Sequence, residues 1–130
     1  LVLAPTGGGF YRSTDGGATW ELLYECYVRA AWVDPTDAQH MLLGPADNVD
    51  QDGRIEETRD GGATWTLASG GLDVPWPNLL VERFYTVGDQ VLAVLNEGLL
   101  YATTVNDWQW RRLVPEIPGI HALAVLEADD

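Results

Sequence analysis

Short apolar segments alternate with turn residues along the whole chain. The apolar segments end at Gly, Pro, Asn or Asp, as in 40–43, 80–87 and 90–95. Segments of this length, bounded in this way, predict β-strands, whereas a helix would need ten or more residues with apolar positions three and four apart. No stretch shows that helical spacing together with capping residues. The chain is therefore expected to be all-β.

One polar turn recurs at a fixed spacing. The octet 13–20, Ser-Thr-Asp-Gly-Gly-Ala-Thr-Trp, returns 45 residues later at 58–65 as Thr-Arg-Asp-Gly-Gly-Ala-Thr-Trp. Another step of 45 residues reaches 103–110, which keeps the first hydroxyl and the closing Trp but has lost the Asp and both glycines. Hydroxyl and carboxylate oxygens accept backbone N–H bonds in turns, and glycine supplies positive φ. Each octet is expected to form a hairpin, with the third less well capped and its Trp108 exposed.

The repeats arrange the predicted strands in cycles of four, A to D, with the octet between C and D. The chain then follows the order B-C-D, A-B-C-D, A-B-C-D, A, over repeats at about 1–26, 27–70 and 71–114 and a last strand at 119–126. A period of about 45 residues, four short antiparallel strands and one Trp per repeat are typical of a β-propeller. We expect one propeller segment over 1–130, with about three four-stranded antiparallel blades.

Three blades leave open sheet edges, because propellers usually close with about four to eight. The chain is then either part of a larger propeller or half of an oligomeric ring. In the second case two copies would join head to tail, and the strand at 119–126 of each copy would complete the first blade of the other.

Composition and charge restrict the partners. The 130 residues include 7 basic and 20 acidic ones, for a formal net charge of −13. This negative field repels phosphate backbones and anionic lipids, and no apolar run approaches the ~20 residues of a transmembrane helix. The single Cys26 excludes an internal disulfide and offers no metal-binding spacing. A protein or a carbohydrate is therefore the expected partner, with neither nucleic acid nor membrane, and no cofactor is expected unless one loop binds Ca²⁺.

The octets resemble the Asp-box, or BNR repeat, Ser/Thr-x-Asp-x-Gly-x-Thr-Trp. This repeat occurs in propellers of sialidases and related glycoside hydrolases, of sortilin-type receptors and of photosystem II assembly-factor-like proteins. The resemblance implies that the octets are structural turns on the face opposite the active site, and it favours an extracytoplasmic location, which the sequence does not otherwise fix. The residues given this structural role are Ser13, Asp15, Gly17, Trp20, Thr58, Asp60, Gly62, Trp65 and Trp110.

Strand polarity gathers the B–C and D–A loops on the face away from the octets, where a propeller is expected to bind its ligands. One of these loops, 47–53, has oxygen-bearing side chains on alternate residues followed by a glycine, like the start of a calcium loop. Arg59 stands where a bidentate Glu belongs, so the alternative is a solvated acidic loop. The candidate calcium ligands are Asn48, Asp50 and Asp52.

A second loop of this face, 69–78, carries Trp76 between two prolines. An exposed Trp beside Asp73 and Asn78 would suit stacking on a sugar ring. The alternative is that Trp76 fills an interface between blades. The candidate ligand-binding residues are Asp73, Trp76, Asn78 and Tyr27.

No residue is assigned to catalysis. The resemblance to sialidases would imply a three-arginine clamp, a Tyr nucleophile paired with Glu, and an Arg-Ile-Pro motif, and the sequence does not assemble this set. Arg12 and Arg59 lie in or beside the octets, on the structural face. The sequence favours a non-catalytic propeller segment that serves as a scaffold or binding module for a protein or glycan. The alternative is part of a sialidase-like or other glycoside hydrolase whose catalytic residues lie mostly outside this chain.

Overall fold

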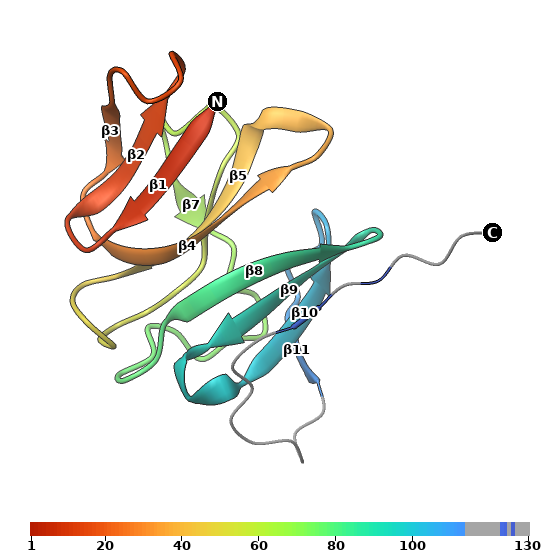
Figure 1. The fold of residues 1–130 in the computed structure, drawn as a ribbon. Helices are drawn as coiled ribbons and strands as arrows, with labels where there is room; N and C mark the ends of the chain where they lie inside the picture. The colour runs from red at the N-terminus through yellow and green to blue at the C-terminus, as the bar shows by residue number, and fades with distance from the viewer. Residues whose placement is uncertain (114–122, 125, 127–130) are drawn as a thin grey trace.

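The strands form three antiparallel sheets in the computed structural model, which describes residues 1–113, 123, 124 and 126 (Figure 1). The strand orders are β1-β2-β3, β4-β5-β6-β7 and β11-β10-β9-β8. The strands are β1 (Val2–Thr6), β2 (Gly9–Ser13), β3 (Glu21–Tyr24), β4 (Tyr27–Asp34), β5 (Asp37–Ala46), β6 (Glu56–Thr58), β7 (Thr66–Leu67), β8 (Val81–Val87), β9 (Gln90–Leu95), β10 (Leu100–Thr104) and β11 (Arg111–Leu113). A short 3-10 turn, η1 (Asn96–Gly98), precedes β10. In the described part of the chain, no helix is long and apolar enough to cross a membrane.

The prediction of an all-β propeller segment is confirmed. Blade 1 (β1–β3) supplies strands B, C and D, while blade 2 (β4–β7) and blade 3 (β8–β11) each supply A to D in order. The turns between β2 and β3 and between β6 and β7 are the two intact octets. The further strand expected at 119–126 falls outside the described residues, apart from 123, 124 and 126.

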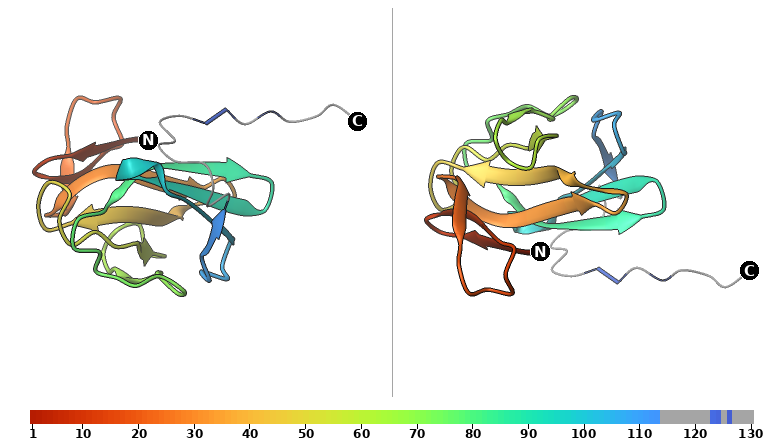
Figure 2. Two further views of the ribbon diagram at one scale, coloured as in Figure 1. Left: turned by 90° about the horizontal axis from the view of Figure 1, so that it is seen from below. Right: turned by 90° about the horizontal axis from the view of Figure 1, so that it is seen from above.

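The sheets meet through their first strands. Strand β4 lies between β1 and β8, and the three run side by side in the middle of the molecule (Figures 1 and 2). Two apolar cores fill the spaces between the blades. The core between blades 1 and 2 is built on Phe10, Val28, Met41 and Leu43. The core between blades 2 and 3 includes Trp32, Leu42, Ile55, Ala68, Trp76, Val81, Val91, Ala93, Trp108 and Trp110.

Pairing registers show which residues take the same place in different blades. Each octet opens with a hydroxyl residue, and this residue pairs with one residue of the preceding strand. The three opening residues are Ser13, Thr58 and Thr103. These partners are Val2, Met41 and Val91, respectively. We call residues that match in this way repeat-equivalent.

Candidate functional site

The first octet is closed by its own side chains. The Ser13 hydroxyl donates to Asp15 Oδ1 at 2.8 Å and accepts the Gly17 N–H at 2.8 Å. Thr19 donates its backbone N–H and its hydroxyl to the same carboxylate, at 2.9 and 2.5 Å. These hydrogen bonds, from the Thr19 side chain above all, lower the pKa of Asp15 to about 2. Asp15 is therefore a capping group of the turn, and all its bonds here stabilise the charged form.

The second octet repeats the same bonds. Thr58 donates to Asp60 at 2.7 Å and accepts the Gly62 N–H at 2.9 Å, and Thr64 donates to Asp60 at 2.9 and 2.5 Å. The pKa of Asp60 is lowered to about 2 for the same reason. Trp65 donates Nε1–H to the Gly62 carbonyl at 3.1 Å, as Trp20 does to Gly17 in the first octet.

Arginines tie neighbouring octets together across the blades. Arg12 Nη1 donates to the Gly61 carbonyl at 2.8 Å, and Arg59 Nη2 donates to Asn106 Oδ1 at 2.7 Å. These arginines join blade 1 to blade 2 and blade 2 to blade 3. The face that carries the octets is therefore a row of linked turns.

The third octet is closed differently. Asn106 has φ 70°, close to the 71° of its repeat-equivalent Gly61, and the Asp107 N–H bonds the Thr104 carbonyl at 3.0 Å. A backbone bond thus closes this turn, whose sequence lacks the capping Asp. The expected exposure of Trp108 is wrong, because its side chain is 9% exposed and lies in the core between blades 2 and 3.

His40 joins this core to the octet face. Its ring is 2% exposed, with Nδ1 2.9 Å from Asp34 Oδ2 and Nε2 2.8 Å from Glu57 Oε2. Glu57 Oε2 also accepts the Trp108 Nε1–H at 2.8 Å, and Arg59 Nη2 lies 3.0 Å from it. Hydrogen bonding to His40 lowers the pKa of Asp34 to about 2. The cluster fixes the position of blade 3 against blade 2.

On the opposite face, Trp76 is not the exposed platform that its sequence context suggested. Its side chain is 6% exposed, and it packs in the core between blades 2 and 3, with its ring 6.4 Å from that of Tyr101. Its backbone N–H bonds the Gly53 carbonyl at 2.9 Å, so the loop backbone is also held. Trp76 therefore fills a blade interface. Asp73 and Asn78 are exposed on the same loop, and their role in binding remains a prediction.

In the acidic loop 47–53, two of the candidate calcium ligands accept hydrogen bonds from other groups of the chain. Asp50 Oδ1 accepts a bond from Arg29 Nη1 at 3.2 Å, and Asn48 Oδ1 accepts the Val49 N–H at 2.8 Å. Within the described residues, no three His, Cys, Asp or Glu side chains gather as they would around a metal ion. Calcium binding by this loop remains a prediction, which thermal unfolding with Ca²⁺ and with EDTA can test.

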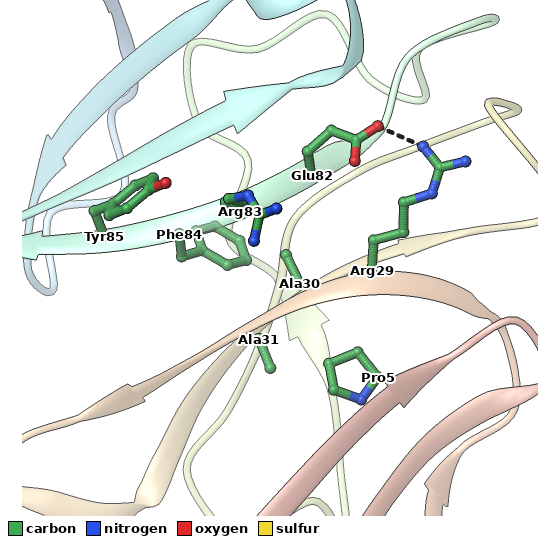
Figure 3. Close-up of a pocket in the computed structure, with 8 residues that line it drawn as sticks. All are labelled: Pro5, Arg29, Ala30, Ala31, Glu82, Arg83, Phe84 and Tyr85. Atoms are coloured by element: carbon green, nitrogen blue, oxygen red, sulfur yellow. Dashed lines mark hydrogen bonds and ion pairs between the residues drawn. The ribbon is translucent and has the colours of Figure 1, made fainter. Parts of the chain in front are cut away.

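A pocket of about 270 Å³ opens where the inner strands β1, β4 and β8 meet (Figure 3). Strand β4 gives one wall and β8 the other, and the end of β1 closes it below. The pocket lies toward the strand ends that carry the B–C and D–A loops, so it faces away from the octets. Its lining residues are Pro5, Arg29, Ala30, Ala31, Glu82, Arg83, Phe84 and Tyr85.

Two β-bulges place the charged residues of this pocket. The register of β4 with β5 slips after Val28, which pairs with Pro45, and that of β8 with β9 slips after Val81. Arg29 follows the first of these residues and Glu82 the second, so they are repeat-equivalent. A bulge turns a side chain out of the regular alternation, and Figure 3 shows the two side chains directed toward one another.

Arg29 is the centre of a polar network. Its Nη1 bonds the Glu82 carboxylate and, at 3.2 Å, Asp50, and its Nε donates to the Tyr27 hydroxyl at 3.1 Å. Partial burial opposes the charge of Arg29, but the bonds to Tyr27 and Glu82 outweigh it and raise the pKa of the guanidinium. The guanidinium of Arg29 therefore stays charged over the whole physiological range.

The remaining polar groups of the pocket lie on β8. Arg83 is exposed and has no ion-pair partner within residues 1–113. The Tyr85 hydroxyl accepts the Leu123 N–H at 3.4 Å. Sequence reasoning assigned Tyr27 to this face but missed Arg29, Glu82 and Arg83. The signal was a charged residue in the second or third position of β4 and of β8, two strands that are otherwise mainly apolar.

Comparisons with known proteins agree with this fold. Residues 11–22 match the family model described as BNR/Asp-box repeat. The crystal structure of the Niastella koreensis GH74 enzyme is similar with a TM-score of 0.68 and 18% sequence identity, over 88% of this chain and 19% of that one. An ancestral GH74 enzyme has a TM-score of 0.49 and 12% identity, over 91% of this chain and 24% of that one. A comparison with curated protein sequences found no match.

The chain thus spans about a fifth of the length of the Niastella koreensis enzyme. Its first octet carries an Asp-box, and its three sheets have the arrangement of propeller blades. The interpretation as a segment of a BNR-type propeller is confirmed.

Proposed function

We propose that this chain is a binding module for neutral carbohydrate, and that the sugar enters the pocket between β1, β4 and β8. The observation that carries the proposal is the pairing of Arg29 with Glu82 at the wall of this pocket. Both residues stand on inner strands held by pairing and by the two blade cores. A site on such rigid elements orders its polar groups before the ligand arrives.

The polar groups offer what adjacent sugar hydroxyls need. A hydroxyl both donates and accepts, a carboxylate only accepts, and a guanidinium only donates. Glu82 and Arg83 are neighbours on β8, so one ligand can meet an acceptor and a donor together. Phe84 and Tyr85 add aromatic surface for the apolar face of a sugar ring.

Charge favours a neutral ligand. Two positive charges, on Arg29 and Arg83, stand near two negative ones, on Glu82 and Asp50, and both carboxylates pair with Arg29. The chain as a whole has a formal net charge of −13, which repels anions. The volume of about 270 Å³ lies just below the usual range for ligand pockets, so the pocket takes a small part of a longer glycan.

Titration calorimetry with a panel of neutral and acidic oligosaccharides tests this proposal. Arg83→Ala should weaken the binding of a neutral ligand about tenfold or more without changing the melting temperature, because Arg83 is exposed and unpaired among the described residues. The matched control is Arg112→Ala, which removes an exposed arginine from the outer strand β11. The proposal fails if no neutral sugar binds, or if Arg83→Ala binds as well as the wild type.

One observation favours a second candidate, part of a glycoside hydrolase. Glu82 and Glu97 both line a hollow next to the pocket, and glycoside hydrolysis uses a pair of carboxyl groups. The GH74 likeness supports this candidate through the fold alone. Turnover of chromogenic glycosides that is lost in Glu97→Gln would establish it and replace the non-catalytic proposal. An extracytoplasmic location is part of both proposals.

A further inference from the structure

One face of blade 1 is apolar and exposed. Leu3 and Phe10 pack into the core with blade 2, so the residues that alternate with them point away from it. Among these, Val2 is 43% exposed, and Trp20 at the end of the octet is 46% exposed. Trp20 therefore does not pack in a core among the described residues. We call this surface the outer face of blade 1; it consists of Val2, Ala4, Tyr11 and Trp20.

The repeat-equivalent positions of blade 2 are covered. Met41 and Leu43, the equivalents of Val2 and Ala4, are 1% and 0% exposed. Trp65, the equivalent of Trp20, packs edge-on against Phe10 and Tyr24 of blade 1, with ring centroids 6.0 and 5.5 Å away. The equivalent positions of blade 3 are covered in the same way.

In blade 3, Val91 and Ala93 are 0% exposed and Trp110 is 5% exposed, all in the core shared with blade 2. Each blade thus uses this set of positions to pack on the blade before it. Only in blade 1, among the described residues, does the set lack a partner.

The packing around the glycines of the two intact octets also indicates that this face of blade 1 lacks a neighbouring blade. They have the same hydrogen bonds and glycine conformations, but a Cβ on Gly62 would lie 2.9 Å from Leu23 of blade 1. A Cβ on Gly17 would meet only the ring of Trp20, its own neighbour, at 3.7 Å, and one on Gly16 would meet nothing within 4 Å. The second turn is packed against a preceding blade, and the first presents the same surface unfilled.

We propose that the outer face of blade 1 is a blade-to-blade interface, and that blade 3 of a second copy of this chain occupies it. Blade 1 offers Leu3, Phe10 and Leu23 to blade 2. The blade 3 residues that match Leu3 and Phe10 are also apolar, namely Leu92 and Leu100, and Leu113 pairs with Leu100. Leu92 and Leu113 are partly exposed, whereas Leu100 is 6% exposed. One chain therefore carries both halves of the contact.

Two copies joined in this way make the contact twice and close a ring of six blades. This proposal is independent of the carbohydrate site. Two chains with a formal net charge of −13 each repel one another, so added salt should strengthen the association by screening that repulsion.

Sedimentation equilibrium of the purified chain over a range of concentrations and salt tests the proposal. The wild type should reach twice the 14.3 kDa of one chain. Trp20→Arg and Val2→Arg each place a charge in the apolar contact and should weaken the dimer about tenfold or more. Circular dichroism should show that both variants remain folded, because both residues are exposed in the single chain.

Leu22→Arg is the matched control. Leu22 is 47% exposed, as Trp20 is, but its repeat-equivalent Leu67 remains 66% exposed beside blade 1. Position 22 is therefore outside the proposed contact, and its variant should still form dimers. A wild type of 14.3 kDa at every concentration overturns the proposal and leaves the face for a different chain. A dimer that resists both arginine variants, or that Leu22→Arg disrupts equally, also overturns it.

Discussion

Arg29 and Glu82 occupy the same position in two successive blades, carry opposite charges and form an ion pair at the pocket between the inner strands. Each follows a valine of its inner strand, at a bulge. A repeated backbone feature thus presents two different side chains to one site. This arrangement explains how a repeat protein can build an asymmetric pocket on its inner strands.

A double-mutant cycle should measure this pair. We expect Arg29→Met and Glu82→Gln to be coupled by about 0.5–1.5 kcal/mol of unfolding free energy, because both side chains are about two-thirds buried. The comparison is the pair of Arg12 and Glu21, whose glutamate is 64% exposed, and its coupling should be near zero. Additive effects of the two changes at positions 29 and 82 would contradict the account.

Acid should unfold the chain through its capping carboxylates. The pKa values of Asp15, Asp34 and Asp60 are lowered from 3.8 to about 2 in the folded chain. Their contribution to stability is therefore complete above the unfolded value and is lost as the pH falls toward about 2. Melting temperatures measured from neutral pH to about pH 2 should drop over this window, and each Asp→Asn variant should show a smaller drop.

Of the two octet variants, Asp60→Asn should lower the melting temperature at neutral pH more than Asp15→Asn does. The turn around Asp60 is packed on Leu23 of blade 1, whereas the turn around Asp15 has no such neighbour among the described residues. Equal effects would show that the packing of the turn adds nothing to its cap.

Trp20 and Trp110, which close the first and third octets, should differ in their effect on stability. Trp110→Ala should cost about 3–5 kcal/mol, because this side chain is 5% exposed and its Nε1–H bonds the Ala68 carbonyl at 2.8 Å. Trp20→Ala should cost less than about 1 kcal/mol in dilute solution, since the side chain is 46% exposed. Urea unfolding of both variants checks the order, and equal costs would contradict the assignment of blade interfaces.

His40→Leu should be strongly destabilising. The change removes the ring nitrogens that lie 2.9 and 2.8 Å from Asp34 and Glu57, and leaving a buried polar group without its hydrogen-bond partner costs about 1–3 kcal/mol. Adding Asp34→Asn and Glu57→Gln to the leucine variant should restore part of the lost stability, because neutral amides then replace the two carboxylates. A leucine variant within about 1 kcal/mol of the wild type would show that His40 does not hold this cluster together.

Much of the fold follows from the repeat alone. The spacing of Trp20, Trp65 and Trp110 fixes the blades and their phase, because each marks the strand after an octet. Exposure could not be predicted in the same way. Trp20 and Trp65 stand in nearly identical sequences, and their surroundings differ because only Trp65 has a preceding blade among the described residues.

The candidate site was harder to predict. The two prolines beside Trp76 favoured an exposed loop residue, but its burial depends on contacts between blades that the sequence does not show. Arg29 and Glu82 lie 53 residues apart on strands, and their meeting depends on two bulges. A bulge has no clear sequence signature here, so the pocket became visible only in three dimensions.

The location of bound sugar tests the central claim most directly. Backbone NMR spectra of the chain, recorded while a neutral oligosaccharide is added, show which amides sense the ligand. The account predicts saturable shifts at Arg29, Glu82, Arg83 and Tyr85, with little change in the octets 13–20 and 58–65. Shifts centred on the octets or on the loop 69–78, or the absence of saturable shifts, would contradict it.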